Sequence, residues 1–481
     1  MSAGSAAPAP RARNLLIVMA DEHRADAMGA AGHPFVRTPA LDALAARGTR
    51  FTKAYTPSPI CVPARAALAT GLPVHRTGHW DSAAPWRGTP ESWMHRLARL
   101  GVETTSFGKL HFGGDPADHG FARQVLPMHV HGEGWTVGLL RDDPPPFDKA
   151  ADLAADLGAG ESEYTRYDRA VADAAAAWLG EPARRAEPWA AFISFVTPHY
   201  PLRAPEPFMA ALAHIDPGLP AAWRETPDHP EIRRLAEFWA YDRHFDEARA
   251  REARRAYFAL CGFTDSLIGQ VLQALAASGA ADDTLVLYLS DHGEMLGDFG
   301  FWTKSVMYEA SARVPMIAAG PGIPVGGISA TPVSLLDVAT TALAQYDAPS
   351  DDLPGGDLAA IARALDDGDR AVFSEYHDGG ASTGAFMLRW DRWKYIHYPG
   401  LAPQLFDLVA DPGERRDLGT DNATDACAAR AEGERRLRAL CDPEAVDRAV
   451  KADQRARVAA LGGREACIAG AFGHTPAPGV D

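Results

Sequence analysis

Short apolar runs alternate with amphipathic stretches over the first three quarters of the chain. The apolar runs have the length of strands, and they predict buried strands at residues 14–20, 101–108, 188–197 and 284–290. Residues 38–47 and 248–278 carry the clearest helical patterns, and Thr38 is placed to cap the first of them. Such alternation is typical of a largely parallel sheet covered by helices, so the sequence predicts an α/β fold.

The pattern changes after a stretch rich in Asp, Gly and Pro at residues 349–357. Beyond it, three strand-like segments are followed by two helical ones, at residues 371–376, 385–390, 393–398, 423–440 and 446–461. We therefore predict a large α/β domain over residues 1–365. A smaller α+β domain with an antiparallel sheet and an extended tail is expected over residues 366–481. Residues 217–255, rich in charge, Pro and Trp, are expected to be a connecting region.

Composition excludes some partners. The 481 residues are 47% hydrophobic and 23% charged, which is ordinary for a globular protein. The formal net charge of −16 argues against a nucleic-acid or anionic-membrane partner. An anionic substrate would then need a local cationic site.

The cysteine pattern bears on the compartment. The five cysteines are odd in number, widely spaced and without a Cys-x-x-Cys pair, which fits a reducing compartment better than a disulfide framework. The apolar run at residues 15–20 is too short for a signal or a membrane span, and no later run reads as long enough. We expect a cytoplasmic protein without a membrane partner. A secreted relative that has lost its signal remains an open alternative.

Polar side chains follow each of the four predicted strands directly. In open α/β sheets, ligands bind outside the carboxyl ends of the strands. The residues at these ends are Asp21, then Lys109 and His111, then His199, then Asp291 and His292. The sequence therefore predicts one polar site at this edge of the sheet.

Cys61 stands at the start of a predicted short helix. Pro63 suits the first turn of a helix, and Gly71 suits its end. Free N–H groups at such a helix start favour anions, and Arg65, one turn later, shares the face of Cys61. A lone cysteine is more often buried and inert than functional.

A cysteine followed by proline two residues on and arginine four residues on is the core of the sulfatase signature. The chain therefore resembles the type I formylglycine-dependent sulfatases of the alkaline phosphatase superfamily. Further matches are the Gly-Lys-Leu-His-Phe run at 108–112, the Ser-Asp-His-Gly-Glu run at 290–294, Lys304, and residues 405–418. Within the family, the chain is most similar to the branch of choline sulfatases and phosphonate monoester hydrolases. The resemblance implies an alkaline-phosphatase-like sandwich with a large, mostly parallel central sheet.

The resemblance also implies a cofactor set. A formylglycine-generating enzyme would oxidise Cys61 to 3-oxoalanine (formylglycine). One divalent metal ion, Ca²⁺ first with Mn²⁺ or Mg²⁺ as alternatives, would be held by residue 61 with Asp21, Asp291 and His292. Glu22 is a further implied ligand, although the family usually has Asp or Gln there.

The catalytic roles implied by the resemblance fall on residue 61 and five other positions. Residue 61 would attack sulfur, Arg65, Lys109 and Lys304 would bind the sulfuryl oxygens, His199 would assist the leaving alcohol, and His111 would act as the later base. The function expected is hydrolysis of a small-molecule sulfate ester. The alternative is hydrolysis of a phosphonate monoester or phosphodiester at the same site. A rival from another class is a binding protein in which Cys61 stays a thiol.

Two further expectations concern the substrate and the assembly. Tryptophans could form an aromatic wall for a quaternary ammonium group, which makes choline-O-sulfate one candidate, although core packing is the commoner use. The residues considered are Trp80, Trp86, Trp93, Trp135 and Trp302. The Gly- and Pro-rich arm at residues 472–481 suggests exchange between protomers, in a homodimer or homotetramer.

Overall fold

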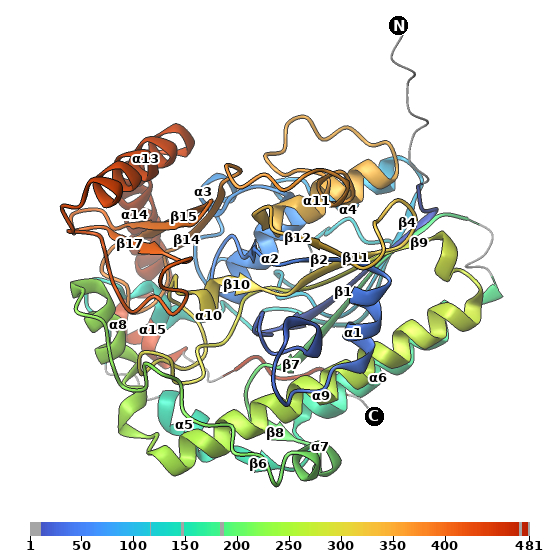
Figure 1. Cartoon of the computed structure of the whole chain (residues 1–481), viewed down its shortest axis with the longest axis horizontal. Helices are drawn as coiled ribbons and strands as arrows, with labels where there is room; N and C mark the ends of the chain where they lie inside the picture. The colour runs from blue at the N-terminus through green and yellow to red at the C-terminus, as the bar shows by residue number, and fades with distance from the viewer. Residues whose placement is uncertain (1–10, 116, 146–148, 183–186, 471–473, 480–481) are drawn as a thin grey trace, which may run out of the picture.

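The computed structural model describes residues 11–115, 117–145, 149–182, 187–470 and 474–479. An eight-stranded sheet forms the centre of the molecule, in the order β12-β2-β11-β9-β1-β7-β4-β5 (Figure 1). All neighbouring strands are parallel except the two pairs that β11 makes with β9 and β2. The strands are β1 (Asn14–Asp21), β2 (Gly48–Phe51), β4 (Glu103–Lys109), β5 (Arg123–Met128), β7 (Trp189–Pro198), β9 (Thr284–Ser290), β11 (Met316–Ala319) and β12 (Gly327–Ser329).

Helices cover both faces of this sheet (Figure 1). One face carries α1 (Pro39–Ala46), α6 (Glu163–Leu179) and α9 (Glu247–Ser278). The other carries α2 (Cys61–Thr70), α4 (Trp93–Arg99) and α11 (Leu336–Gln345). Alternate residues of β1 enter opposite layers, since Leu16 packs in the first core cluster and Leu15 in the second. Burial on both faces explains why the central strands read as continuous apolar runs.

A second, antiparallel sheet of four strands stands beside the first. It consists of β14 (Val372–Tyr376), β15 (Ala385–Trp390), β16 (Trp393–His397) and β17 (Gln404–Asp407). The C-terminal helices follow it as α13 (Thr424–Leu440), α14 (Pro443–Ala460) and α15 (Arg464–Ala469). The predicted fold class is confirmed, whereas the division at residue 365 stays a prediction. Residue 472 and the end of the predicted arm lie outside the described residues.

The remaining elements are short. They are β3 (Ala54–Tyr55), β6 (Leu157–Ala159), β8 (Leu202–Ala204), β10 (Arg313–Val314), β13 (Val333–Ser334), α3 (Val74–Thr77), α5 (Lys149–Ala155), α7 (Glu206–Ala211), α8 (Pro230–Trp239), α10 (Glu309–Ala312) and α12 (Leu358–Arg363), with single 3₁₀ turns at Gly29–Ala31, Thr136–Leu139, Tyr241–Arg243 and Ala281–Asp283.

The sequence interpretation missed α8, which lies within the stretch expected to be a connecting region. Pro230 opens this helix, and Ile232, Leu235 and Trp239 are buried on one side of it. These apolar positions recur at helical spacing, but charged residues between them hide the period.

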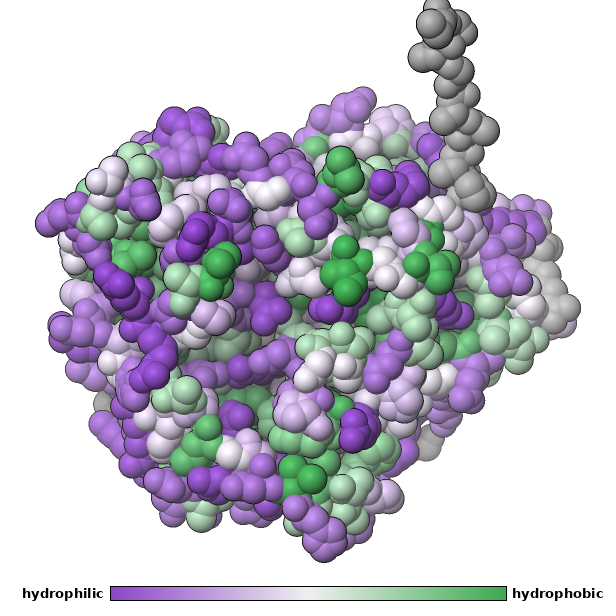
Figure 2. All heavy atoms as spheres, in the orientation of Figure 1, coloured by the Kyte–Doolittle hydropathy of each residue, from purple (hydrophilic) through white to green (hydrophobic). Residues whose placement is uncertain are grey.

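Among the described helices, α9 is long and apolar enough to cross a membrane by length and composition. The expectation that no run would pass this test was therefore wrong. However, 61% of the most apolar window of α9 is buried, and the helix packs against α6 and β7. On the face drawn in Figure 2, hydrophobic side chains lie scattered among hydrophilic ones.

Candidate active site

The carboxyl ends of four adjacent strands carry the residues that the sequence pointed to. β9, β1, β7 and β4 run parallel, so their ends lie along one rim. Asp21 ends β1, Lys109 ends β4, Asp291 follows β9, and His199 follows β7. Cys61, the first residue of α2, faces the same rim, since its sulfur groups with Asp21, Asp291 and His292.

Cys61 is buried at the helix start, with 7% of its surface exposed. The preceding Ile60 is extended, and Gly71 ends the helix in the left-handed conformation, at φ 71°. Burial, with a smaller effect of the neighbouring Asp21 carboxylate, raises the pKa of the Cys61 thiol to about 11. A thiol with such a pKa stays protonated at neutral pH, so it is a poor nucleophile and a poor metal ligand as it stands.

Arg65 bridges the two rim carboxylates. Its Nη2 donates to Asp21 Oδ2 and its Nε donates to Asp291 Oδ2, both at 2.8 Å. Its Nη1 donates to the carbonyl oxygen of Lys109, at 2.7 Å. Among the described residues that line the cavity, Arg65 is absent. The guanidinium is thus engaged by the two carboxylates and a carbonyl oxygen, and its predicted contact with sulfuryl oxygens stays a prediction.

Three acceptor atoms face one another at the rim, and Asp291 Oδ1 among them already accepts from the N–H groups of Glu22 and His292. His292 Nδ1 donates to the Gly293 carbonyl oxygen at 3.0 Å, which leaves Nε2 as the acceptor nitrogen. That Nε2 lies 3.7 Å from Asp21 Oδ1 and 3.8 Å from Asp291 Oδ1. Asp21 Oδ1 and His292 Nε2 are buried and have no hydrogen-bond partner among the described residues. Burial would raise the pKa of Asp21, but Lys109 and Arg65 hold it well below its usual range.

This donor set fits a divalent cation. Two carboxylate oxygens and one imidazole nitrogen converge without a proton between them, and the Cys61 sulfur lies within the same group. Glu22 belongs to a second group, with Asp21 and His199, so its predicted place among the ligands stays a prediction.

Glu22, His199 and Lys304 form a buried cluster beside this point. Lys304 Nζ lies 3.2 Å from Glu22 Oε2 and 2.8 Å from His199 Nε2. Burial lowers the pKa of His199 well below its usual range, and the Lys304 charge adds to this effect. His199 Nδ1 donates to the Tyr200 carbonyl oxygen at 2.7 Å, so the neutral ring accepts from Lys304 at Nε2. Burial also raises the pKa of Glu22 to about 8.

Lys109 and His111 complete the predicted set on the opposite side. Lys109 Nζ lies 2.7 Å from Asp21 Oδ2. His111 adopts a left-handed conformation, at φ 54°, and both of its ring nitrogens are buried without a hydrogen-bond partner among the described residues. Burial lowers its pKa well below the usual range, and the Lys109 charge lowers it further. The ring is therefore neutral and able to accept a proton.

Glu294 shapes the loop that carries Lys304. Its Oε1 accepts from the backbone N–H of Leu296 at 2.8 Å and of Thr303 at 2.6 Å. The Ser305 N–H donates to the Pro59 carbonyl oxygen at 3.0 Å, which ties this loop to the segment before Cys61. Sequence reasoning quoted Glu294 only as part of a matching run and assigned it no role.

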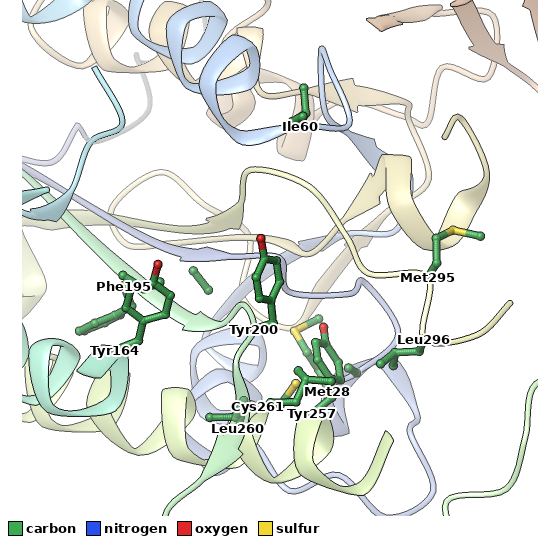
Figure 3. Close-up of a cluster of buried hydrophobic side chains, with 14 of the residues drawn as sticks. Met28, Ile60, Tyr164, Phe195, Tyr200, Tyr257, Leu260, Cys261, Met295 and Leu296 are labelled. Atoms are coloured by element: carbon green, nitrogen blue, oxygen red, sulfur yellow. The ribbon is translucent and has the colours of Figure 1, made fainter. Parts of the chain in front are cut away.

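A cavity of about 90 Å³ is lined by Cys61, Lys109, His111, His199 and Lys304. Its outer wall is largely aromatic, with Trp135, Tyr164, Tyr200, Trp239 and Tyr241 among the lining residues. Trp135 stacks on Trp239 at 5.6 Å, and Trp239 stacks on Tyr241 at 6.0 Å. Figure 3 shows the hydroxyl groups of Tyr164 and Tyr200 pointing toward the side on which Ile60 lies.

Of the five tryptophans considered for an aromatic wall, Trp135 alone lines this cavity within the described part of the chain. Trp86, Trp93 and Trp302 are core residues with at most 1% exposed, and Trp80 packs edge-on against His377. Trp239, which the sequence interpretation missed, stands at the end of α8. The helical spacing of α8 was the signal that could have indicated it.

Three comparisons with known proteins agree with this geometry. The family profile described as Sulfatase matches residues 13–348, and one described as N-sulphoglucosamine sulphohydrolase, C-terminal, matches residues 297–439. The choline-sulfatase of Rhizobium meliloti (strain 1021) is 34% identical over 463 residues, which cover 92% of this chain and 90% of that protein. Human arylsulfatase K is 30% identical over 84% of this chain and 78% of its own length. The phosphonate monoester hydrolase of Agrobacterium radiobacter superimposes with a TM-score of 0.72 at 27% identity, covering 89% of this chain and 95% of that one.

Proposed function

Because the chain belongs to the sulfatase family and is a sulfuric ester hydrolase, we propose that it cleaves a small organic sulfate monoester at this site. Residue 61 acts as formylglycine, formed by a maturation enzyme that oxidises Cys61. One divalent cation, Ca²⁺ in the first place, is held by Asp21, Asp291 and His292 together with residue 61. When bound, this cation supplies positive charge that lowers the pKa of a hydroxyl on residue 61.

The other residues divide the remaining work. Lys109 offsets negative charge on the sulfuryl oxygens, and Lys304 does so from the opposite side. His199 and Lys304, joined by the hydrogen bond from Lys304 Nζ to His199 Nε2, together supply a proton to the alcohol oxygen as the S–O bond breaks, and Lys304 is its source. His111, neutral and without a partner among the described residues, is the base of the later step. Arg65 keeps the two rim carboxylates in place.

One observation carries this proposal. Asp21 Oδ1 and His292 Nε2, each buried and without a hydrogen-bond partner in the described chain, face the point beside Cys61. Burying such acceptors unsatisfied is costly, so a site of this kind is built for a ligand that it does not itself supply.

Single-turnover chemistry tests the role of residue 61. Wild type co-expressed with a formylglycine-generating enzyme should hydrolyse 4-nitrophenyl sulfate through many turnovers. The mass of its peptide should show that residue 61 has lost its sulfur and two hydrogens and gained one oxygen, which distinguishes the aldehyde from a serine. Cys61→Ser offers one hydroxyl instead of two, so it should react at most once and stop as a sulfated serine. Sustained turnover by Cys61→Ser would contradict the proposal, and an unmodified, inactive wild type would favour the binding-protein alternative.

The aromatic wall and the choline-sulfatase relative support choline-O-sulfate as the first substrate to try. The phosphonate monoester hydrolase neighbour supports the second candidate, a phosphonate monoester or phosphodiester. Comparing kcat/KM for choline-O-sulfate, 4-nitrophenyl sulfate and phenyl phenylphosphonate decides between them. A higher value for the phosphonate would reverse the assignment. Cytoplasmic location and a homodimer or homotetramer stay predictions.

A further inference from the structure

The end of β7 departs from regular pairing just before His199. Met19 of β1 pairs with Ser194 of β7, and the next pair is Asp21 with Pro198. Between these pairs β7 advances by four residues and β1 by two, which makes a bulge in β7. On the other side of β7, the ladder to β4 ends at Ser194. Residues 195–197 therefore lack a regular strand partner, and their buried N–H groups need other acceptors.

One buried carboxylate of α6 accepts these hydrogen bonds. Asp168 accepts from the N–H of Val196 at 2.8 Å and from the N–H and hydroxyl of Thr197 at 2.7 Å each. Thr264 Oγ1 lies 2.8 Å from the same Thr197 hydroxyl. Asp168 is completely buried and does not belong to the described cavity lining. None of the steps assigned above uses it.

The same bulge holds the backbone of His199. The carbonyl oxygen of Val196, whose N–H is bound by Asp168, accepts from the His199 N–H at 3.1 Å. The ring of His199 is then oriented by Tyr200, through the Nδ1 hydrogen bond and a stack at 4.2 Å between ring centroids. Asp168 thus fixes where the histidine stands, and Tyr200 fixes how its ring turns.

We infer that Asp168 is a positioning residue for leaving-group departure. It holds the β7 bulge in the geometry that presents His199 Nε2 to the ester oxygen, and it acts through Val196 and Thr197 without touching substrate. The inference rests on the proposed function, in which His199 assists the alcohol. As the S–O bond breaks, its electron pair goes to the ester oxygen, which then takes a proton from the His199–Lys304 pair. An alcohol of high pKa depends on this proton, whereas an acidic phenol leaves without it.

A series of substituted phenyl sulfates, with phenol pKa values from about 7 to 10, tests the inference through Asp168→Asn. For the best leaving group, kcat/KM should stay within about threefold of wild type, and for the poorest it should fall about 30-fold. His199→Asn should likewise make kcat/KM depend more steeply on the pKa of the leaving phenol. Adding Asp168→Asn to His199→Asn should then cost less than about twofold, because the two changes remove one interaction.

Controls separate this role from general damage. Asp173, also on α6, bonds Gln270 on the exposed side, and Asp173→Asn should leave the series unchanged. If Asp168→Asn fails to fold, Thr197→Val takes its place, because it removes one of the three donors to Asp168. It should lower kcat/KM about threefold for the substrate with the poorest leaving group and leave kcat/KM for the best one unchanged. An equal loss for all substrates, no loss, or a full additional loss in the double variant would overturn the inference. Failure of the proposed function would instead appear in wild type, as no sulfate turnover at all.

Discussion

The rim of the main sheet and the contact between the antiparallel sheet and α10 both bury charged side chains. At the contact, Lys394 of β16 lies 2.7 Å from both Glu309 and Glu414 and donates to the Met307 carbonyl oxygen at 2.9 Å. Glu309 Oε2 lies 2.9 Å from Arg313 Nε, and Glu414 Oε2 accepts from the Glu309 N–H. We call these three residues, Lys394, Glu309 and Glu414, the Lys394 cluster.

The rim uses its charges differently. Arg65 and Lys109 satisfy one oxygen of Asp21, while its other oxygen and His292 Nε2 have no partner among the described residues. Four of the residues that shape the site adopt left-handed conformations, namely Glu22, His111, Thr303 and Ser305. A buried charge cluster whose polar atoms all bind one another serves to hold the fold together. A cluster that keeps buried acceptor atoms without a partner is suited to binding a ligand.

The largest effect should come from Asp291→Asn at the rim. We expect kcat to fall at least about a thousandfold, since each tenfold loss corresponds to about 1.4 kcal/mol of barrier. In the presence of a chelator, the melting temperatures of variant and wild type should differ little, because Arg65 keeps its bond to Asp21. Kinetics on matured protein and thermal melting measure the two quantities. The control is Asp298→Asn, which removes a carboxylate that pairs with Arg24 outside the cavity. Global unfolding of Asp291→Asn would contradict the distinction between the rim and the Lys394 cluster, because Asp291 would then be needed for folding.

The opposite behaviour is expected of Lys394→Met. Removing the cation leaves the buried Glu414 without its cationic partner and Glu309 with Arg313 alone, so the free energy of unfolding should fall by about 3 to 5 kcal/mol. The folded fraction should keep its kcat within about twofold, because the cluster does not line the cavity within the described residues. Urea unfolding and active-site titration test both points. Lys451→Met, which breaks the more exposed pair with Asp447, should cost under about 1 kcal/mol. A loss of kcat without a loss of stability would contradict the distinction.

Acid should lower the stability of the protein through Glu375 of β14. Like the Lys394 cluster, this buried carboxylate is satisfied by neighbouring side chains. Burial would raise its pKa, but hydrogen bonds from His377 and His75 lower it to about 2 from the ordinary 4.5. Because the folded state holds this pKa low, the stability is complete above pH 4.5 and is lost as the pH falls toward 2. Glu375→Gln should therefore cost about 3 kcal/mol at pH 7 and progressively less at lower pH. A constant difference between wild type and variant at pH 7, 4.5 and 3 would contradict this assignment.

Metal removal should have a smaller effect on stability than Lys394→Met. A cation present at 100 times its Kd stabilises the folded state by about 2.7 kcal/mol, so a chelator should lower the melting temperature of wild type by this equivalent. The melting temperature of Asp291→Asn should respond less, while that of Lys394→Met should shift as much as wild type. Calorimetry with and without EDTA measures these shifts. Equal responses of wild type and Asp291→Asn would show that Asp291 does not hold the metal.

Local pattern was sufficient for much of the fold and for part of the site. The buried runs predicted β1, β7 and β9 to within about two residues, and chain order placed Asp21, His199 and Asp291 at one rim. The spacing of the signature also predicted that Arg65 lies near residue 61, but it could not reveal that two carboxylates bind the guanidinium. Which partner the guanidinium binds depends on residues that come together only in the folded protein.

Two other features depend on long-range contacts. Trp239 and Tyr241 belong to a charged stretch whose helix has an obscured period, and only packing against Trp135 brings them to the cavity. Asp168, on an amphipathic helix, resembles any surface carboxylate in the sequence. Its role becomes visible only where β7 bulges, and a bulge leaves no regular signal in the apolar pattern.

The aromatic wall and the rim come from different kinds of chain segment, and this separation has an evolutionary consequence. Among the residues proposed to hold the metal and the sulfuryl group, Asp21, Lys109 and Asp291 stand at the ends of core strands, whose replacement disturbs both layers of the protein. Trp135, Trp239 and Tyr241 stand in connections and at a helix end, where substitutions disturb the fold less. Lineages sharing this architecture can therefore exchange one alcohol for another while inheriting the same bond-breaking apparatus unchanged.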